Sequence, residues 1–392
     1  MQESKKIINI PKWPFADKME EEAVKEVLAS VSWWRNTGTQ VKLFEKEFAQ
    51  YQGCKGGLTV ANGTVALEIA LKSLGIGEGD EVIVPDFTFY STVSAVLAVR
   101  AIPVLVDVKE DTFCIDPEKI EKAVTDKTKA VIPVHIAGQI ADMDAINEIA
   151  KKYNLFVIED SAHAHGAIRK EKRAGCFGIM STFSFQNAKL ITAGEGGIIL
   201  SNDEKLLHNA LLEANCGRDE GDTSYKHVLI GGNARLSEVQ GAILRVQLSR
   251  LTDQIELREK NYKYLAECSK SIPGIIFQKV EEDITVNPHY MIMFYYDKNA
   301  FGGASRAEFL EYLKNAGIPV NRSYESIHRL PIFKTLPLDA WRMCGTKGKD
   351  GITHCANSER ISDEVVCLSH NILLGDEALI NDIVEVIGNF NT

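Results

Sequence analysis

Short apolar segments alternate with helical stretches over the first half of this 392-residue chain. Residues 81–85, for example, are almost continuously apolar, as are strands that a sheet buries on both faces. Such strands separated by helices indicate βαβ units and a mostly parallel sheet, and therefore the α/β fold class. We expect strands at residues 58–61, 81–85, 103–107, 130–134, 155–159, 182–185 and 197–201. Helices are expected at residues 17–28, 39–51, 62–74, 92–100, 116–124 and 142–153.

The pattern changes after a long helical stretch at residues 237–259. One strand at residues 290–296 and helices at residues 306–316 and 378–388 are typical of a smaller α+β unit. A chain of 392 residues is also too long for one simple core. We therefore expect a large α/β domain with an N-terminal helical segment over residues 1–250, and a small C-terminal α+β domain over residues 251–392.

Charge and cysteine usage exclude several classes of protein. With 44 basic and 54 acidic residues, the net charge of −10 argues against a surface for nucleic acid or anionic membranes. We find no run of apolar residues long enough to span a bilayer, and no signal peptide. The eight cysteines are scattered and lack the CxxC spacing of zinc sites, which indicates reduced thiols and no bound metal. We expect a cytoplasmic protein.

An acidic residue ends one of the predicted buried strands. In the segment VIED the strand closes on Asp160. Ligands of open α/β sheets bind at the carboxyl ends of the strands, so this carboxylate can face a ligand. Pyridoxal phosphate (PLP) needs such a group beside its pyridine nitrogen, to keep that nitrogen protonated while the ring accepts electrons. A solvated acid, or an N-cap of a helix at residues 161–167, explains Asp160 equally well.

A lysine follows the next predicted strand and precedes a glycine-rich turn. The segment FSFQNAKLITAGEGG contains Lys189, with Gly194, Gly196 and Gly197 after it. Glycines permit sharp turns and a close approach of the backbone. A lysine in a loop is ordinarily solvated, but this context favours a desolvated amine with a lowered pKa, which can attack an aldehyde.

Two further motifs lie at strand ends. Asn62-Gly63-Thr64 opens a predicted helix, where free backbone N–H groups and the helix dipole suit a phosphate. An ordinary turn with a capped helix has the same sequence. Phe89, in the segment PDFTF, can stack on a flat cofactor ring or simply pack in the core.

Together these motifs resemble the DegT/StrS-type sugar aminotransferases, which are fold type I PLP-dependent transferases similar to aspartate aminotransferase. The resemblance extends over nearly the whole chain. Besides the glycine-threonine turn, it rests on the segments VPDFTF, EDSAHAHGA, FSFQNAKLITAGEGG, GGNARLSEVQGAIL and NSERISDEVVCLSH. It implies pyridoxal 5′-phosphate as the cofactor and transamination as the reaction.

The resemblance also implies roles for single residues. Lys189 would hold the cofactor as a Schiff base, Asp160 would pair with the pyridine nitrogen, and His163 would contact the ring or its phenolic oxygen. The remaining cofactor contacts would be a stacking aromatic ring and four phosphate ligands, namely Phe89, Gly63, Thr64, Ser184 and Asn233. Asn233 would reach the phosphate of the neighbouring subunit, which implies a homodimer with shared active sites.

Within the family, the chain looks most like the branch of aminocyclitol aminotransferases and 3-amino-5-hydroxybenzoate (AHBA) synthases. The likeness lies in FSFQNAKLITAGEGG, in the pair Trp33-Trp34, and in the segments CGR at 216–218 and HYM at 289–291. By the same resemblance, the candidate substrate contacts are Arg218, Tyr290, Tyr324 and His328. Ordinary packing or an exposed polar position explains Tyr324 and His328 at least as well.

The implied reaction moves an amino group from glutamine or glutamate to a cyclic keto sugar, a nucleotide-linked keto sugar or a keto-cyclitol. Lys189 would carry protons between substrate and cofactor as general base and acid. The main alternative is an AHBA-synthase-like dehydratase that uses the same lysine to eliminate water. A non-catalytic PLP-binding regulator is disfavoured because no DNA-binding segment is evident. A nucleotide-binding oxidoreductase would need GxGxxG after the first strand, where it is absent.

Overall fold

The computed structural model describes residues 8–337, 339–347 and 353–390. At its centre lies an eight-stranded sheet in the order β1-β9-β8-β5-β4-β2-β3-β14. Its strands are β1 (Gly56–Val60), β2 (Glu81–Pro85), β3 (Ile102–Val106), β4 (Thr128–Val131), β5 (Phe156–Asp160), β8 (Met180–Ser184), β9 (Gly197–Ser201) and β14 (Arg342–Cys344). β9 runs antiparallel to both of its neighbours, and the other adjacent strands pair in parallel. The predicted mostly parallel sheet is confirmed.

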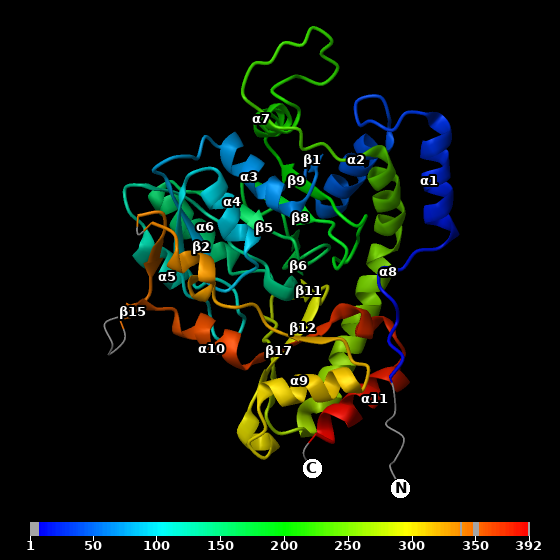
Figure 1. Cartoon of the computed structure of the whole chain (residues 1–392), viewed down its shortest axis with the longest axis vertical. Coiled ribbons are helices and arrows are strands. Elements are labelled where there is room, and N and C mark those ends of the chain that lie inside the picture. Colours follow the sequence, from blue (N-terminus) through cyan, green and yellow to red (C-terminus); the bar gives the residue numbers. More distant parts are fainter. Residues whose placement is uncertain (1–7, 338, 348–352, 391–392) are drawn as a thin grey trace.

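Both faces of this sheet are covered by helices. Helices α5 (Pro117–Ala123) and α6 (Met143–Tyr153) contribute to the core on one face. Helices α3 (Gly63–Ser73), α4 (Ser91–Ala98) and α7 (Glu204–Ala214) contribute to the core on the other face (Figure 1). Successive residues of β2 enter different cores, Ile83 the first and Val82 and Val84 the second. Burial on both faces explains why the strands are continuous apolar runs in the sequence.

Side-chain caps determine where several helices begin. Asp17 caps α1 (Lys18–Ser30), and Asn62 caps α3 by accepting a bond from the Val65 amide at 2.9 Å. Ser237 forms a capping box at the start of α8 (Glu238–Cys268), which continues well beyond residue 259. Helix α2 (Gln40–Gln52) ends at Gly53, which adopts the left-handed conformation.

A second, antiparallel sheet lies in the C-terminal region, in the order β10-β12-β17-β13. Its strands are β10 (Ile275–Phe277), β12 (Met291–Tyr296), β13 (Val320–Arg322) and β17 (Val365–Ser369). Helices α9 (Arg306–Asn315) and α11 (Glu377–Gly388) share its core, in which Phe294, Phe309 and Ile383 are fully buried. This is the smaller α+β unit that the sequence predicts. The remaining α-helix and strands of the described residues are α10 (Ala356–Glu364), β6 (Ile168–Arg169), β7 (Lys172–Arg173), β11 (Ile284–Val286), β15 (Thr346–Lys347) and β16 (Thr353–His354).

Helix α8 joins the two regions. It runs from the side of α1 and α2 down to α11 and the second sheet (Figure 1). The predicted boundary between residues 250 and 251 falls inside this helix, and β14 pairs with β3 of the large sheet. The exact boundary therefore stays a prediction.

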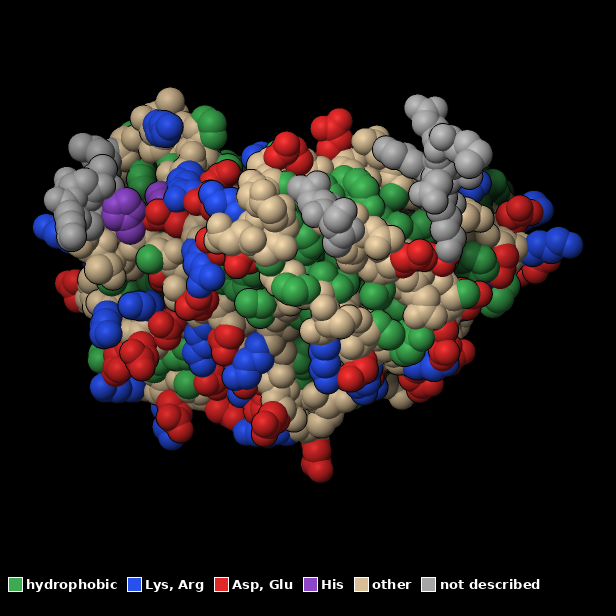
Figure 2. All heavy atoms as spheres, turned by 90° about the horizontal axis from the view of Figure 1, so that it is seen from below, with side chains coloured by type: hydrophobic (Ala, Val, Ile, Leu, Met, Phe, Trp, Pro, Cys, Tyr) green, Lys and Arg blue, Asp and Glu red, His purple; other side chains and the backbone are tan. Residues whose placement is uncertain are grey.

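The described residues contain no helix that is long and apolar enough to cross a membrane. On the face that Figure 2 presents, acidic and basic side chains are interspersed around an apolar stretch. That face offers no continuous basic surface.

Candidate active site

A cavity of about 660 Å³ lies where β5, β8 and β2 end at their carboxyl termini. Its lining comes from seven separate parts of the chain, several of which meet because the parallel strands bring their ends to one edge of the sheet. The predicted residues that line it are Gly63, Thr64, Phe89, Asp160, His163, Ser184, Lys189, Tyr290 and Tyr324. The structure does not place Asn233, Arg218 or His328 in this lining.

Asp160 is the last residue of β5, and its side chain is only 6% exposed. The Thr92 hydroxyl donates to Oδ2 at 2.8 Å, and the Ala162 amide donates to Oδ1 at 3.2 Å. Burial raises the pKa of Asp160, whereas these bonds and the charge of Lys189 oppose the rise. Residues 161–167 form turns. The alternative of a helix N-cap at Asp160 is therefore wrong, and the carboxylate lines the cavity instead.

Lys189 lies in the loop after β8, where its amide donates to the Gln186 carbonyl at 2.8 Å. Its Nζ lies 4.4 Å from the centroid of the Tyr290 ring. Burial lowers the pKa of Lys189 to about 8, although the nearby Asp160 carboxylate favours the charged form. A lysine with this pKa can be neutral, and hence nucleophilic, close to physiological pH.

Three side chains that the sequence analysis missed hold the backbone at Lys189. Trp13 donates through Nε1 to the Lys189 carbonyl at 3.1 Å, and His370 Nε2 lies 3.2 Å from the Ala188 carbonyl. Arg258 of α8 donates to Nδ1 of His370 at 3.2 Å. Because Nδ1 accepts this bond, Nε2 carries the ring proton and donates to Ala188. His370 belongs to the CLSH motif, but a single arginine within a helix gave no signal of this role.

His163 is buried and neutral. Its Nδ1 accepts a bond from the Ala137 amide at 3.3 Å, so the ring proton lies on Nε2, which is 3.5 Å from the Tyr324 hydroxyl. The ring stacks on Tyr290 with centroids 4.2 Å apart. Burial is the main reason that the pKa of His163 lies well below its usual value. The residue can therefore donate a neutral hydrogen bond at the edge of the cavity.

The start of α3, which lines the cavity, is suited to an anion. The first amides of a helix have no carbonyl partner within it, and those of α3 belong to Gly63 and Thr64. The Thr64 hydroxyl donates to Ser91 Oγ at 2.7 Å. A Cβ atom on Gly63 would lie 2.9 Å from the Cβ of Ser184, so only glycine lets this turn approach β8 so closely.

An aromatic wall completes the cavity. Phe89 is 55% exposed, and its ring centroid lies 5.8 Å from that of Tyr324. A flat heterocycle can stack on such a ring. Asn62, the N-cap of α3, also lines the cavity. So do polar residues to which the sequence analysis gave no role, namely Thr88, Ser91, Thr182, Gln186 and Glu195.

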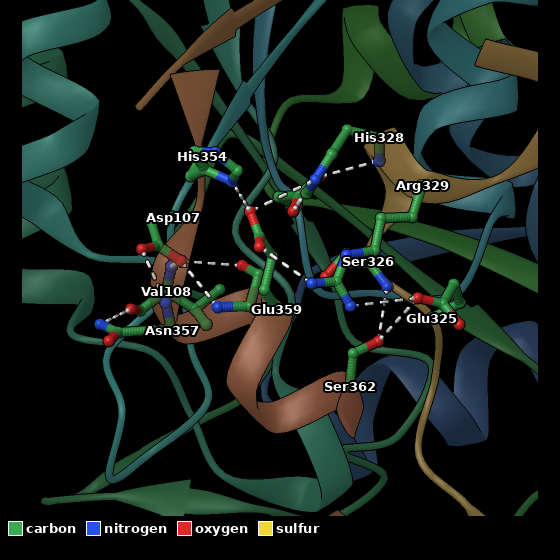
Figure 3. Close-up of polar contacts among 12 residues, drawn as sticks. Asp107, Val108, Glu325, Ser326, His328, Arg329, His354, Asn357, Glu359 and Ser362 are labelled. Carbon is green, nitrogen blue, oxygen red and sulfur yellow. Dashed lines mark hydrogen bonds and ion pairs between the residues drawn. The ribbon is translucent and has the colours of Figure 1, made fainter. Parts of the chain in front are cut away.

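His328 lies in a separate polar cluster, together with Glu359, Arg329 and His354 (Figure 3). Its Nδ1 lies 2.8 Å from Oδ2 of Asp86, and its Nε2 lies 3.5 Å from Glu359. Hydrogen bonding to Asp86 raises the pKa of His328 against the effect of burial. This position indicates that His328 links the end of β2 to the segment that carries Tyr324.

Arg218 and Asn233 lie in the segment between α7 and α8, which projects from the molecule in Figure 1. The Arg218 guanidinium lies 4.9 Å from the centroid of Tyr225, a ring that is largely exposed. Asn233 is exposed and pairs with Asn215 in an isolated bridge. Within one chain, neither residue reaches the cavity lining.

The lining fits PLP in four respects. It offers a buried carboxylate, an amine with a lowered pKa, an exposed aromatic face and a helix N-terminus beside two hydroxyl groups. The described part of the chain contains no group of three or more His, Cys, Asp or Glu residues that could hold a metal ion.

Comparisons with known proteins agree with this geometry. Residues 14–387 match the DegT/DnrJ/EryC1/StrS aminotransferase family. The 3-amino-5-hydroxybenzoate synthase of Amycolatopsis mediterranei is 37% identical over 390 residues, which cover 98% of each chain. A putative L-glutamine:3-amino-2,3-dideoxy-scyllo-inosose aminotransferase of Streptoalloteichus tenebrarius is 36% identical over 88% of this chain and 85% of the relative. A crystal structure of AHBA synthase superposes with a TM-score of 0.91 at 38% identity, covering 98% of this chain and 99% of the other.

Proposed function

The chain belongs to the DegT/DnrJ/EryC1/StrS aminotransferase family, and on this premise we propose that it transfers the amino group of glutamine to a keto-cyclitol. It is a PLP-dependent enzyme that transfers amino groups to keto-cyclitols or keto sugars. The observation that carries the proposal is one cavity in which Lys189, Asp160 and the start of α3 face a common space.

Six of the lining residues have tasks in this proposal. Bound PLP supplies an electron sink for the substrate carbon that loses its proton. Lys189 would hold the cofactor through its aldehyde, and its Nζ would then hold and return the substrate proton. Asp160 would keep the ring nitrogen protonated, and His163 would donate from Nε2 at the cavity edge. The amides of Gly63 and Thr64, with the hydroxyl of Ser184, would bind the phosphate.

The polar groups of the cavity support a keto-cyclitol as the acceptor. Besides Lys189, the described lining has several hydroxyl and amide side chains. Such groups can form hydrogen bonds to the hydroxyl groups of a polyhydroxy ketone. Glutamine is favoured as the donor by the name of the inosose aminotransferase relative.

Isotope transfer tests the proposal. The PLP-loaded enzyme is mixed with glutamine labelled with ¹⁵N at the α-amino group, and the cofactor spectrum is followed. We expect the absorbance of the PLP cofactor near the visible range to fall when glutamine is added. It should return when a scyllo-inosose-type ketone is added. The amine product should contain the label. Failure of both glutamine and glutamate to change the spectrum, or a product without the label, would contradict the proposal.

A second candidate reaction is the dehydration carried out by an AHBA-synthase-like enzyme. It is favoured by the 37% identity to AHBA synthase over 98% of both chains. In this case a cyclic amino-ketone substrate would lose water and become aromatic, and no nitrogen would come from glutamine. Mass spectrometry of the product distinguishes the two reactions.

We also propose a cytoplasmic homodimer in which each active site uses residues of both chains. Large apolar side chains are exposed near α1 and between α7 and α8, including Trp33 (54%), Trp34 (46%) and Ile230 (100%). We propose that these exposed apolar side chains contribute to an association surface. A partner subunit seated there would bring its own Asn233 and Arg218 toward a site that neither residue reaches within its own chain.

A further inference from the structure

Two cysteines that are far apart in the sequence meet at the end of α2. Cys54 follows Gly53 at the end of that helix, and Cys176 lies in the turn between β7 and β8. Their Sγ atoms are 2.8 Å apart. Sulfur atoms at this separation need only small side-chain rotations to form a covalent bond.

The two thiols differ in exposure and in acidity. Cys54 is buried, at 8% exposure, whereas Cys176 is half-buried and lines a surface cavity of about 520 Å³ with Lys172 and Arg173. The contact between the two sulfur atoms lowers the pKa of Cys176 and raises the pKa of Cys54. Lys172 and Arg173 also favour the Cys176 thiolate, and Glu159 opposes it. Cys176 is therefore the accessible nucleophile and Cys54 the buried partner.

We propose that Cys54 and Cys176 form a reversible disulfide, with a low-molecular-weight disulfide of the glutathione class as the oxidant. The Cys176 thiolate attacks the small disulfide, forms a mixed disulfide and releases one small thiol. Cys54 then loses its proton and attacks Sγ of Cys176, which releases the second small thiol. Two protein thiols are oxidised, and one small disulfide is reduced to two thiols.

This disulfide would link the end of α2 to the turn that holds the Glu159 carboxylate. Glu159 lies next to Asp160, the acid that we propose to pair with the cofactor. The amides of Gly175, Phe177 and Gly178 donate to the Glu159 carboxylate at 2.6–2.7 Å, and Glu159 precedes Asp160 in β5. Gln52 already joins the two segments, because its side chain donates to the Ala174 carbonyl at 3.0 Å. The disulfide would therefore secure a contact that exists in the reduced chain, without moving the cavity.

Thiol counting and peptide mapping on the full-length holoenzyme test the proposal. The reduced enzyme is equilibrated with mixtures of oxidised and reduced glutathione, quenched with acid, and digested without reduction. We expect two of the eight thiols per chain to disappear first, with one peptide pair linked through Cys54 and Cys176. The midpoint of thermal unfolding should rise by about 5 °C and return on addition of dithiothreitol.

Single variants separate the two steps. Cys54→Ser should stop at one glutathione bound to Cys176, whereas Cys176→Ser should leave Cys54 unmodified because it is buried. Cys268→Ser, at a half-buried cysteine elsewhere, should oxidise as the wild type does. No 54–176 peptide at any glutathione ratio, linkage of another pair first, or glutathione on Cys54 in folded Cys176→Ser would overturn the proposal. Peptide linkage, thiol counts and the unfolding midpoint do not depend on amino transfer. A negative result in these measurements can therefore be told apart from a failure of the proposed reaction.

Discussion

At Lys189 two opposing effects set the proton affinity of a single amine. Burial lowers its pKa to about 8, and the Asp160 carboxylate limits that fall. At pH 7 roughly a tenth of such an amine is neutral, against less than about a thousandth of a solvated lysine. Only the neutral form attacks an aldehyde, so the lowered pKa suits Lys189 to the covalent capture of PLP that we propose.

We expect capture of PLP by the cofactor-free enzyme to accelerate as the pH rises toward 8 and to level off above it. The neutral fraction of Lys189 increases over this range and then saturates. Stopped-flow absorbance gives the rate, and borohydride reduction followed by peptide mapping identifies the modified lysine. Lys189→Ala should show neither capture nor turnover. A rate independent of pH, or a label on another lysine, would count against this role.

Asp160→Asn should leave PLP bound but lower kcat by about 100-fold or more, because the ring nitrogen loses the charge that keeps it protonated. The fold should survive, since the change is nearly isosteric and removes a buried charge. The pH midpoint of PLP capture should also move down, because the carboxylate that raises the pKa of Lys189 is gone. Asp144→Asn, at an exposed acid of α6, is the control. An unchanged kcat would mean that another acid performs this task.

Helix α8 carries a buried charge that is only partly satisfied. The side chain of Arg258 is fully buried, and its Nε and Nη1 have no hydrogen-bond partner among the described residues. Burial lowers the pKa of Arg258 to about 9. A charge held in this way costs stability unless it is well paired. Its bond to His370, which in turn holds Ala188, indicates that the helix uses it to position the loop of Lys189.

Arg258→Met should change the free energy of unfolding by no more than about 1 kcal/mol, since the lost bond is offset by the removal of a buried charge. In contrast, kcat at saturating PLP should fall by up to about tenfold, because the ring of His370 loses the bond that orients it. Denaturant titration and steady-state kinetics measure the two effects. His370→Asn added to Arg258→Met should cost less than the sum of the single changes. Lys263→Met, at an exposed position of the same helix, is the control. Strictly additive losses in the double variant would contradict the coupling between Arg258 and His370.

At the scale of the whole molecule, we propose that a second chain contributes to the cavity. The described lining within one chain contains no arginine to pair with the phosphate of PLP. The exposed Asn233 lies just before α8, in the segment that also carries the fully exposed Ile230. A polar residue supplied by a second chain would complete the phosphate site. A charge-assisted bond from Asn233 should contribute roughly 1.5–3 kcal/mol, so Asn233→Ala should weaken PLP binding about tenfold or more.

Mixed dimers test the shared site. Lys189→Ala and Asn233→Ala chains are combined at limiting PLP, at which each parent is inactive. If the sites are shared, one site of a mixed dimer holds both defects and the other holds neither, so activity should return. Native mass spectrometry verifies that mixed dimers have formed. No activity in verified mixed dimers would favour a site built from a single chain, with Asn233 acting only within its own subunit.

The sequence by itself determined the layered architecture and the centre of the site. The strand at residues 81–85 is predicted to the residue, because burial on both faces makes it continuously apolar. Parallel strands present their carboxyl ends at one edge, so residues that end or follow these strands, such as Asp160 and Lys189, line one cavity. Local periodicity and strand-end position are properties of neighbouring residues, and a sequence carries them directly.

Only the tertiary structure decided which remote side chains meet. β14 has no apolar run of its own and becomes a strand by pairing with β3. The contact between Arg258 and His370, the tie between His328 and Asp86, and the meeting of Cys54 with Cys176 each join residues more than a hundred positions apart. Such contacts depend on how whole elements pack in three dimensions. No local pattern of residues encodes them, because their geometry exists only once the chain has folded.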